Sequence, residues 1–171
     1  MAEYVASLIQ KYASKGILVD TNILLVLFFG ALSPERISTR RGTEHFTAND
    51  YVLLNAILVK FRAIVTTPNI LTELNSFINN LSEPDRSKCY RFLAAALNNQ
   101  AGSSPLLEIY APSQNVASLD WPFSTYGLTD CGIADVAKNK YLVLTDDFKV
   151  ASYLNEKGID TISFVNLKYG Q

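Results

Sequence analysis

Acidic side chains recur in this sequence where short apolar segments end and where helices are expected to begin or run close by. The candidates come from four separated segments and are Asp20, Glu73, Asp130, Asp146 and Asp147. Carboxylates that are brought together repel one another, raise one another's pKa values and cost stability unless a cation neutralises them. Mg²⁺ and Mn²⁺, hard cations that prefer oxygen ligands, are their natural partners. Such a metal can hold a phosphodiester, generate hydroxide and stabilise the leaving oxygen.

Residues 128–148 indicate how two of these segments would meet. The pattern predicts a helix that opens at Thr129-Asp130 and runs to about Lys138, then a strand over residues 141–145, then the pair Asp146-Asp147. In an α/β unit, a helix that leads into a strand starts near the carboxyl edge of the sheet, and the strand ends at that edge. We therefore expect Asp130 and the acidic pair to be neighbours in space.

Two further acids are expected at the same edge. Asp20 directly follows the apolar strand expected over residues 17–19. Glu73 lies six residues beyond Thr67, which places it about 9 Å along its helix at 1.5 Å per residue. A glutamate on the inward face of that helix could reach back to the edge. Thr21 and Asn22 are expected to cap the following helix and to support Asp20 by hydrogen bonds.

Short apolar strands alternate with helices along the chain. The expected strands are 17–19, 63–66, 106–110, 141–145 and 161–165, and the expected helices are 3–14, 23–32, 47–62, 67–80, 82–100, 129–138 and 149–157. Residues 33–46 are polar and irregular, and residues 113–126 give no clear pattern. The alternation predicts an α/β fold, a three-layer α/β/α sandwich around a mainly parallel sheet, in one domain spanning residues 1–171.

The composition is that of an ordinary globular protein, with 49% hydrophobic and 18% charged residues in 171. A net charge of −1 gives no overall basic field, which argues against tight non-specific binding of nucleic acid but not against an enzyme that grips a short stretch of backbone. Two cysteines are too few for a disulfide framework or a zinc cluster. The longest apolar run, residues 23–32, is too short to span a bilayer, and with no leader signal we expect a cytoplasmic protein without membrane contact.

Four segments resemble, in their order and spacing, the acidic motifs of PIN domains, and the resemblance spans almost the whole chain. They are ILVDTN (17–22), TPNILTEL (67–74), LTDCGIADVA (128–137) and LVLTDDF (142–148). The resemblance implies a Mg²⁺- or Mn²⁺-dependent endoribonuclease that hydrolyses RNA phosphodiester bonds, a fold commonly found as the toxin of a toxin–antitoxin pair. It also implies an RNA substrate, an antitoxin protein as partner and a homodimer.

On this resemblance, Asp20, Glu73 and Asp130 match the first three acids of the family, and Asn22 matches a polar residue that supports the first. Both Asp146 and Asp147 match the fourth. All five are thus expected to act as catalytic residues and metal ligands. Asp135 departs from the family, which usually has small or apolar residues there, and is expected at the surface. The helix 82–100 and the segment 113–126 exceed the compact toxin members, which weakens the toxin assignment more than the nuclease assignment.

Simpler interpretations of the same residues stay open. Asp20 and Asp130 could serve only as acids that stabilise helix N-termini, and Glu73 could lie on a solvated helix face. His45, the only histidine, is expected to be a loop residue. The basic segment that contains Arg36, Arg40, Arg41 and His45 could grip phosphates beside the acids or be a solvated loop. The alternative function is a non-catalytic PIN-like binding or regulatory module.

Overall fold

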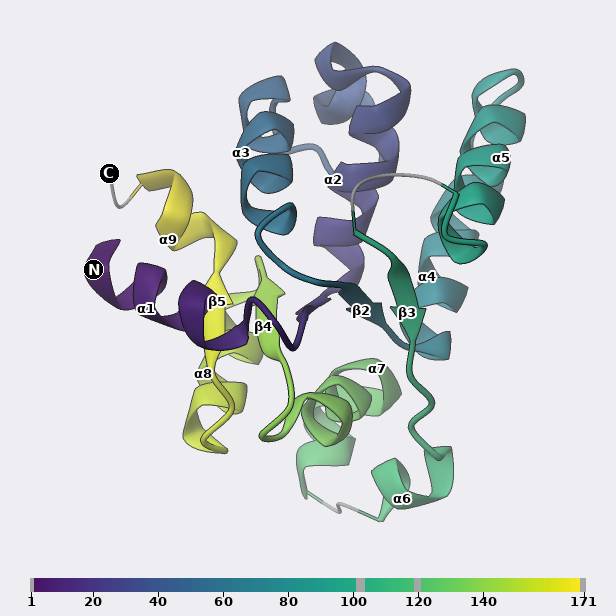
Figure 1. The fold of residues 1–171 in the computed structure, drawn as a ribbon. Coiled ribbons are helices and arrows are strands. Elements are labelled where there is room, and N and C mark those ends of the chain that lie inside the picture. Colours follow the sequence, from purple (N-terminus) through teal and green to yellow (C-terminus); the bar gives the residue numbers. More distant parts are fainter. Residues whose placement is uncertain (1, 101–103, 119–120, 170–171) are drawn as a thin grey trace.

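Five short parallel strands form one sheet in the order β3-β2-β1-β4-β5 (Figure 1). The computed structural model describes residues 2–100, 104–118 and 121–169. The strands are β1 (Ile17–Val19), β2 (Ile64–Thr66), β3 (Leu106–Glu108), β4 (Leu142–Thr145) and β5 (Thr161–Ser163). The expected strands are therefore all present, and the sheet is wholly parallel, as the alternation of strands and helices requires.

The order of the strands reverses at β1. The chain adds β2 and β3 on one side of β1 and then returns to add β4 and β5 on the other. Leu18 is the Cα partner of Val65 in β2 and of Val143 in β4. A parallel sheet wound in two directions leaves a crevice at the carboxyl ends of the strands where the direction changes, and this is where such folds bind ligands. Here the direction changes between β1 and β4, and we call the carboxyl ends of these two strands the crevice.

Helices cover the sheet on two sides. In Figure 1, α2 and α3 stand above the strands, and α7 and α8 lie below them, so the α/β/α sandwich expected from the sequence is confirmed. The helices are α1 (Ala2–Tyr12), α2 (Thr21–Leu32), the 3₁₀ helix η1 (Pro34–Thr39), α3 (Ala48–Leu58), α4 (Pro68–Asn79), α5 (Asp85–Leu97), α6 (Ser113–Ala117), α7 (Trp121–Ala137), α8 (Phe148–Glu156) and α9 (Phe164–Tyr169).

Local capping chemistry starts several helices where the sequence predicts. Thr47 and Asp50 form a reciprocal capping box at the start of α3. The Thr67 side chain accepts a hydrogen bond from the Ile70 amide, and Pro68 occupies the first position of α4. Asp20 is the N-cap of α2. One of the candidate acids, Asp20, therefore also determines where a helix begins.

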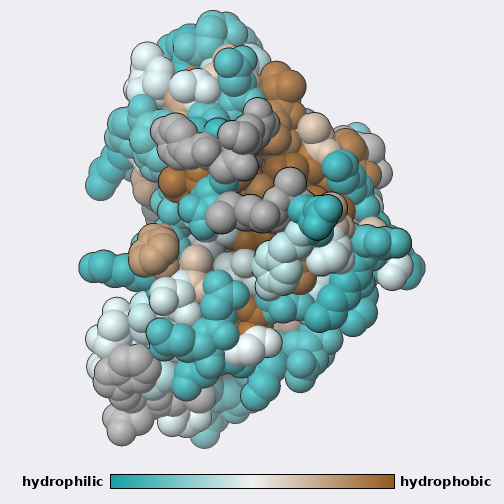
Figure 2. All heavy atoms as spheres, turned by 90° about the vertical axis from the view of Figure 1, so that its left-hand side faces the viewer, coloured by the Kyte–Doolittle hydropathy of each residue, from teal (hydrophilic) through white to brown (hydrophobic). Residues whose placement is uncertain are grey.

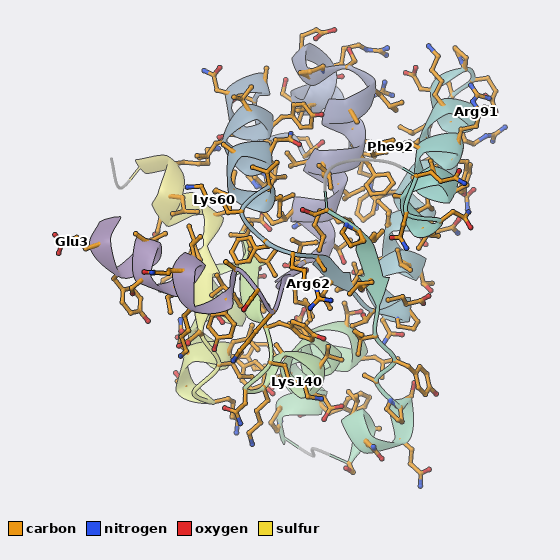
Figure 3. The ribbon with its side chains drawn as sticks, viewed as in Figure 1. Glu3, Lys60, Arg62, Arg91, Phe92 and Lys140 are labelled. Carbon is orange, nitrogen blue, oxygen red and sulfur yellow. The ribbon has the colours of Figure 1, made fainter. Side chains whose placement is uncertain are left out.

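The core is organised around α2, which is apolar on nearly all sides. Its residues Ile23, Leu24, Leu25 and Val26 are fully buried. Gly30 allows α3 to approach closely, since a Cβ there would lie 2.2 Å from the Tyr51 ring. From α5, Phe92 points toward α2 (Figure 3), and its ring meets that of Phe28 edge-on with centroids 5.0 Å apart. The helix that carries Asp20 at its start is thus held rigidly by packing.

Helix ends differ from the sequence prediction where backbone contacts end the helix early. By Arg62 the chain has left α3, and the Arg62 N–H bonds the Ala13 carbonyl at 2.7 Å. The helix α5 ends at Leu97 because Asn99 has a positive φ of 56° and the Gln100 N–H bonds the Ala95 carbonyl.

Other differences concern caps and short helices. The helix expected from residue 82 begins at Asp85 instead, and Pro84 occupies the cap position without a side-chain bond. Residues 164–165, expected in the last strand, begin α9 instead, and residues 113–126 contain α6 and the first turns of α7.

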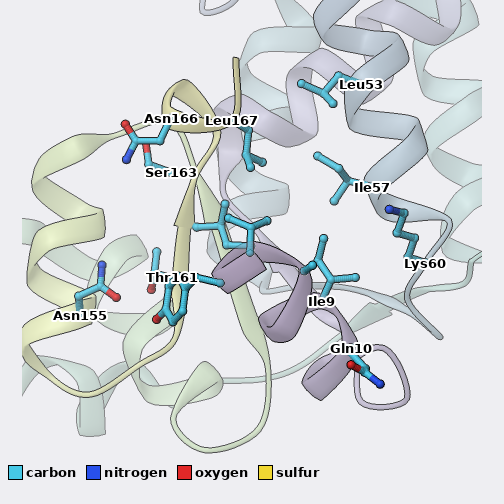
Figure 4. A pocket seen from close by; sticks show the side chains of 14 residues that line it. Ile9, Gln10, Leu53, Ile57, Lys60, Asn155, Thr161, Ser163, Asn166 and Leu167 are labelled. Atoms are coloured by element: carbon cyan, nitrogen blue, oxygen red, sulfur yellow. The ribbon is translucent and has the colours of Figure 1, made fainter. Parts of the chain in front are cut away.

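An apolar pocket of about 730 Å³ opens beside α1, α3, β5 and α9, and residues from both chain ends line it (Figure 4). Figure 2 views this side of the molecule and shows apolar residues in the middle of the face, framed by hydrophilic ones. Of the described residues that line the pocket, only Tyr4 and Lys60 are ionisable, so this pocket offers binding surface rather than reactive groups. No helix in the described parts of the chain is long and apolar enough to cross a membrane.

Candidate functional site

Asp20 lies at the crevice between β1 and β4 and is almost fully buried, with 7% of its surface exposed. Its backbone N–H bonds the Leu144 carbonyl at 3.0 Å, which continues the pairing of the two strands. Asp20 Oδ1 accepts a hydrogen bond from the Thr21 amide at 2.6 Å, and Oδ2 accepts one from the Thr145 hydroxyl at 2.6 Å. The carboxylate is therefore a helix cap that also faces the end of the neighbouring strand.

Glu73 reaches back from α4 to the same crevice. Its Oε2 accepts a hydrogen bond from the Thr21 hydroxyl and its Oε1 from the Thr129 hydroxyl, both at 2.5 Å. Those threonines belong to the first turn of α2 and to α7, so Glu73 of α4 links three helices. The inward orientation expected for Glu73 is confirmed, and the solvated-face interpretation is wrong.

Asp130 is placed by a break inside α7. Gly127 has φ 73° and ψ −167°, a backbone conformation that glycine adopts readily, and the helix restarts after it. Thr129 and Asp130 therefore stand in the first turn after the break, as expected, where a helix N-terminus favours negative charge. Burial raises the pKa of Asp130 to about 7, and the negative charges of Asp20, Glu73 and Asp147 add to that rise.

The last two acids take different roles although they are adjacent. Asp147 caps α8, because its Oδ1 accepts from the amides of Lys149 at 2.7 Å and Val150 at 3.1 Å. Asp146 has only 6% of its side chain exposed, and its Oδ2 lies 2.9 Å from His45 Nε2. Its other oxygen, Oδ1, is buried and has no hydrogen-bond partner among the described residues. Asp146 is thus the acid whose unpartnered oxygen is buried.

The electrostatics of the crevice are unfavourable without a counterion. Burial raises the pKa of Asp20 to about 6, although the hydrogen bonds from Thr145 and the Thr21 amide oppose the rise, and the charges of Asp146 and Glu73 increase it. Glu73 and Asp146 act electrostatically on Asp20, and Asp20, Glu73 and Asp147 act on Asp130. The structure therefore brings all of them into one field, in which a buried negative charge is held at a cost.

The donor set fits a hard divalent cation. Carboxylate oxygens are the ligands that Mg²⁺ and Mn²⁺ prefer. One such oxygen, Asp146 Oδ1, is buried without a hydrogen-bond partner among the described residues. Within the described residues, no three His, Cys, Asp or Glu side chains converge into a ready-formed metal cage. Mg²⁺ does not need such a cage, since it usually keeps several waters and binds through one or two carboxylates together with substrate phosphates.

Several residues of the site were not identified as such from the sequence. Thr129 and Thr145 hold Glu73 and Asp20, and a threonine next to an acid at 20–21, 129–130 and 145–146 was the available signal. His45, expected to be a plain loop residue, contacts Asp146. Asp135 is exposed, as expected.

Two arginines of the basic segment pair with an acid of the protein itself, and the phosphate-gripping hypothesis stays a prediction. Arg36 and Arg40 both form ion pairs with Asp85 of α5, the first at 3.1 Å, and so fasten η1 to that helix. Arg40 is also not a solvated loop residue, because only 10% of its side chain is exposed. Arg41 is exposed and lies over the Phe77 ring, with Cζ 6.0 Å from the centroid.

Comparison with models of known protein families gives no match to this chain, and comparison with curated proteins finds none of significant similarity.

Proposed function

We propose that this chain is a Mg²⁺- or Mn²⁺-dependent endoribonuclease of the PIN type. The observation that carries the proposal is the electrostatic interaction among Asp20, Glu73, Asp130 and Asp146, which come from four separated segments, at a place where burial and the neighbouring acids raise the pKa values of Asp20 and Asp130 to about 6 and 7. Acids held this close together lower the stability of the fold unless a cation is bound. Groups with strongly shifted pKa values are concentrated at functional sites, which supports a functional role for these acids.

The contacts of each acid suggest its role in binding the metal or the attacking water. Asp20, Asp130 and Asp146 would hold the ion, and Asp146 Oδ1 would be one ligand, since this oxygen is buried without a hydrogen-bond partner among the described residues. Glu73, fixed by two threonine hydroxyls, would position the metal or the attacking water. The bound metal would supply an activated water and stabilise charge on the leaving oxygen. Asp147 is committed to capping α8 and would add charge rather than a ligand.

RNA as the substrate rests on the resemblance of the four acidic motifs to PIN domains. The toxin role, an antitoxin partner and a homodimer rest on the same resemblance. Light scattering on the isolated chain tests the homodimer, and rescue of growth arrest by a co-expressed neighbouring gene product tests the toxin role.

RNA cleavage by the purified protein tests the enzymatic proposal. Wild-type protein should cleave RNA when Mn²⁺ is present and not when it is chelated, and Asp20→Asn should abolish the cleavage. Asp135→Asn is the matched control, since it removes an exposed acid from the helix that carries Asp130. Equal cleavage by Asp20→Asn and wild type would exclude the proposed site.

A second candidate is a non-catalytic binding or regulatory module with the same fold. It is favoured by the lack, among described residues, of three metal-ligating side chains in a closed cluster. Such a module would bind one structural ion or contact a partner at the crevice. Heat stabilisation by Mn²⁺ without RNA cleavage would support the structural ion, and no effect of Mn²⁺ at all would support the partner.

A further inference from the structure

His45 enters the acidic crevice from a segment that the proposed mechanism does not use. It lies between η1 and α3, and its Nε2 is 2.9 Å from Asp146 Oδ2 although the two residues are 101 positions apart. The imidazole side chain is 54% exposed, whereas the carboxylate is 6% exposed. A surface group therefore bonds a buried one at the edge of the site.

The two oxygens of Asp146 have unlike surroundings. Oδ2 meets His45, while Oδ1 is buried without a hydrogen-bond partner in the described chain. A buried acceptor that is left unsatisfied costs free energy, and a cation would remove that cost. Because a carboxylate is planar, a bond that fixes Oδ2 also fixes the direction in which Oδ1 points.

We propose that His45 is the positioning residue of this site: by holding Asp146 Oδ2, it turns Oδ1 toward the divalent cation. The inference rests on the proposed function, since it assumes that the crevice binds such an ion. Groups that orient metal ligands in this way typically contribute 10–100-fold to metal affinity or activity. His45 touches a ligand and not the ion, so its effect passes through Asp146.

Contacts from two other elements hold His45 in place. Its backbone carbonyl accepts a hydrogen bond from Lys168 Nζ of α9 at 3.2 Å. Lys168 also pairs with Asp50, in the first turn of α3, at 2.9 Å. The centroids of the His45 and Phe46 rings are 4.1 Å apart, and Phe46 is fully buried and packs against Phe164. The backbone of His45 is thus anchored by Lys168, and its half-exposed ring rests against the buried Phe46, which together hold the imidazole as a positioning residue requires.

Mn²⁺ binding to the full chain tests this role without measuring cleavage. Mn²⁺ alone is titrated and its free concentration is followed by electron paramagnetic resonance, with melting temperatures measured in chelator. The variants are His45→Ala, His45→Gln and Glu44→Gln. Glutamine places an N–H donor near the position of Nε2, and Glu44→Gln is the matched control, because Glu44 is exposed in the same loop and bonds the Gly42 amide rather than Asp146.

We expect His45→Ala to weaken Mn²⁺ binding about tenfold, His45→Gln to restore most of the affinity, and Glu44→Gln to bind as wild type. A purely electrostatic effect has the opposite sign, because removal of a group that can carry positive charge would favour a cation. Unchanged affinity in His45→Ala, or no recovery in His45→Gln, overturns the positioning role. A fall in the metal-free melting temperature that matches the loss of affinity also overturns it. If wild type itself binds no Mn²⁺, the proposed function fails first.

Discussion

The hydroxyl of Thr145 donates a hydrogen bond to Asp20 Oδ2 at 2.6 Å, across the strand boundary where the order of the sheet reverses. Both residues are buried, and Thr145 has no exposed surface. The bond favours the charged form of Asp20 and lowers the pKa that burial raises. The fold therefore keeps a buried carboxylate where the strand order reverses, and the neighbouring hydroxyl partly offsets the free-energy cost of burying its charge.

Thr145→Val should lower the stability of the protein more at high pH than at low pH. At about pH 8 the variant leaves a buried carboxylate oxygen without its donor, which costs about 2 kcal/mol. Near pH 5 Asp20 is protonated and needs that donor less, so the loss should be smaller. Urea unfolding at both pH values measures the difference. Equal losses would show that the hydroxyl serves mainly to accept the Asp147 N–H.

Metal-free protein should lose stability as the pH rises from about 4 to 7. The pKa of Asp20 is about 6 in the folded chain, compared with 3.8 for an unperturbed aspartate. Between those values the folded chain keeps a proton that the unfolded chain has released, so unfolding becomes easier with rising pH. The contribution of Asp20 is about 3 kcal/mol at 1.36 kcal/mol per unit. Asp130 acts in the same direction up to about pH 7.

Urea unfolding in chelator at several pH values checks this slope, with Asp20→Asn as the comparison. The variant cannot ionise and should be at least as stable as wild type near pH 8 and should show a shallower decline. Asp85 and Asp160 have lowered pKa values because of their cationic partners, so their contributions are lost only as the pH falls below about 4. A stability that rises between pH 4 and 7 would contradict the raised pKa values.

Thr129→Val should impair RNA cleavage with little effect on folding. The variant removes the hydroxyl that bonds Glu73 Oε1, leaving Thr21 as the remaining hydroxyl donor to Glu73. A less fixed Glu73 should lower cleavage about tenfold at saturating Mn²⁺. Thr72→Val on the exposed face of α4 is the control, because its hydroxyl bonds only its own helix. Full activity in Thr129→Val would remove Glu73 from a positioning role.

Local chemistry made much of the fold predictable. Strands such as Ile17–Val19 are short apolar runs because the parallel sheet is buried on both faces, and caps such as Thr47 and Thr67 act within one turn of their helices. Glu73 was a candidate because the rise of its helix leaves it about 9 Å from the helix start, within reach of a long side chain, but the sequence did not determine which face of the helix it occupies. The helix start at Thr129-Asp130 was predicted, but the preceding turns of α7 and the break at Gly127 were not.

The remaining contacts depend on chain paths that no local pattern determines. His45 meets Asp146 across 101 residues, and Arg40 meets Asp85 across 45. Residues so far apart in the sequence share no helix face or strand register, so residue types and spacing do not predict that they are in contact. The last helix, α9, has only six residues, too few to show a helical period. Its Lys168 nonetheless fixes the loop that carries His45.

Asp147 and Asp146 should respond differently to the same substitutions. Asp147→Ala removes the cap of α8 and should cost about 1 kcal/mol of stability, whereas Asp147→Asn, an equally good cap, should cost little. Neither should greatly weaken Mn²⁺ binding, while Asp146→Asn should weaken it strongly because it changes the acid with the unpartnered oxygen. Thermal unfolding and Mn²⁺ titration of the three variants measure both effects. Stronger loss of Mn²⁺ binding in Asp147→Asn would reverse the assignment.

Lys168→Met should destabilise the protein and disturb the site from a distance. The Lys168 and Asp50 side chains are only 13% and 7% exposed and form an ion pair at 2.9 Å. Methionine keeps the apolar stem of the side chain but leaves the Asp50 carboxylate without its cation, which typically costs about 3–5 kcal/mol of stability. Asp50 keeps its bonds from the Thr47 amide and hydroxyl. We therefore expect a loss near the lower value, about 3 kcal/mol. The variant also frees the His45 carbonyl, so Mn²⁺ affinity should fall with stability.

Asp50→Asn combined with Lys168→Met should recover part of the stability, since no buried charge is then left alone, and urea unfolding of the single and double variants measures that recovery. A double variant no more stable than the single one would show that the ion pair is not what holds α9 to α3.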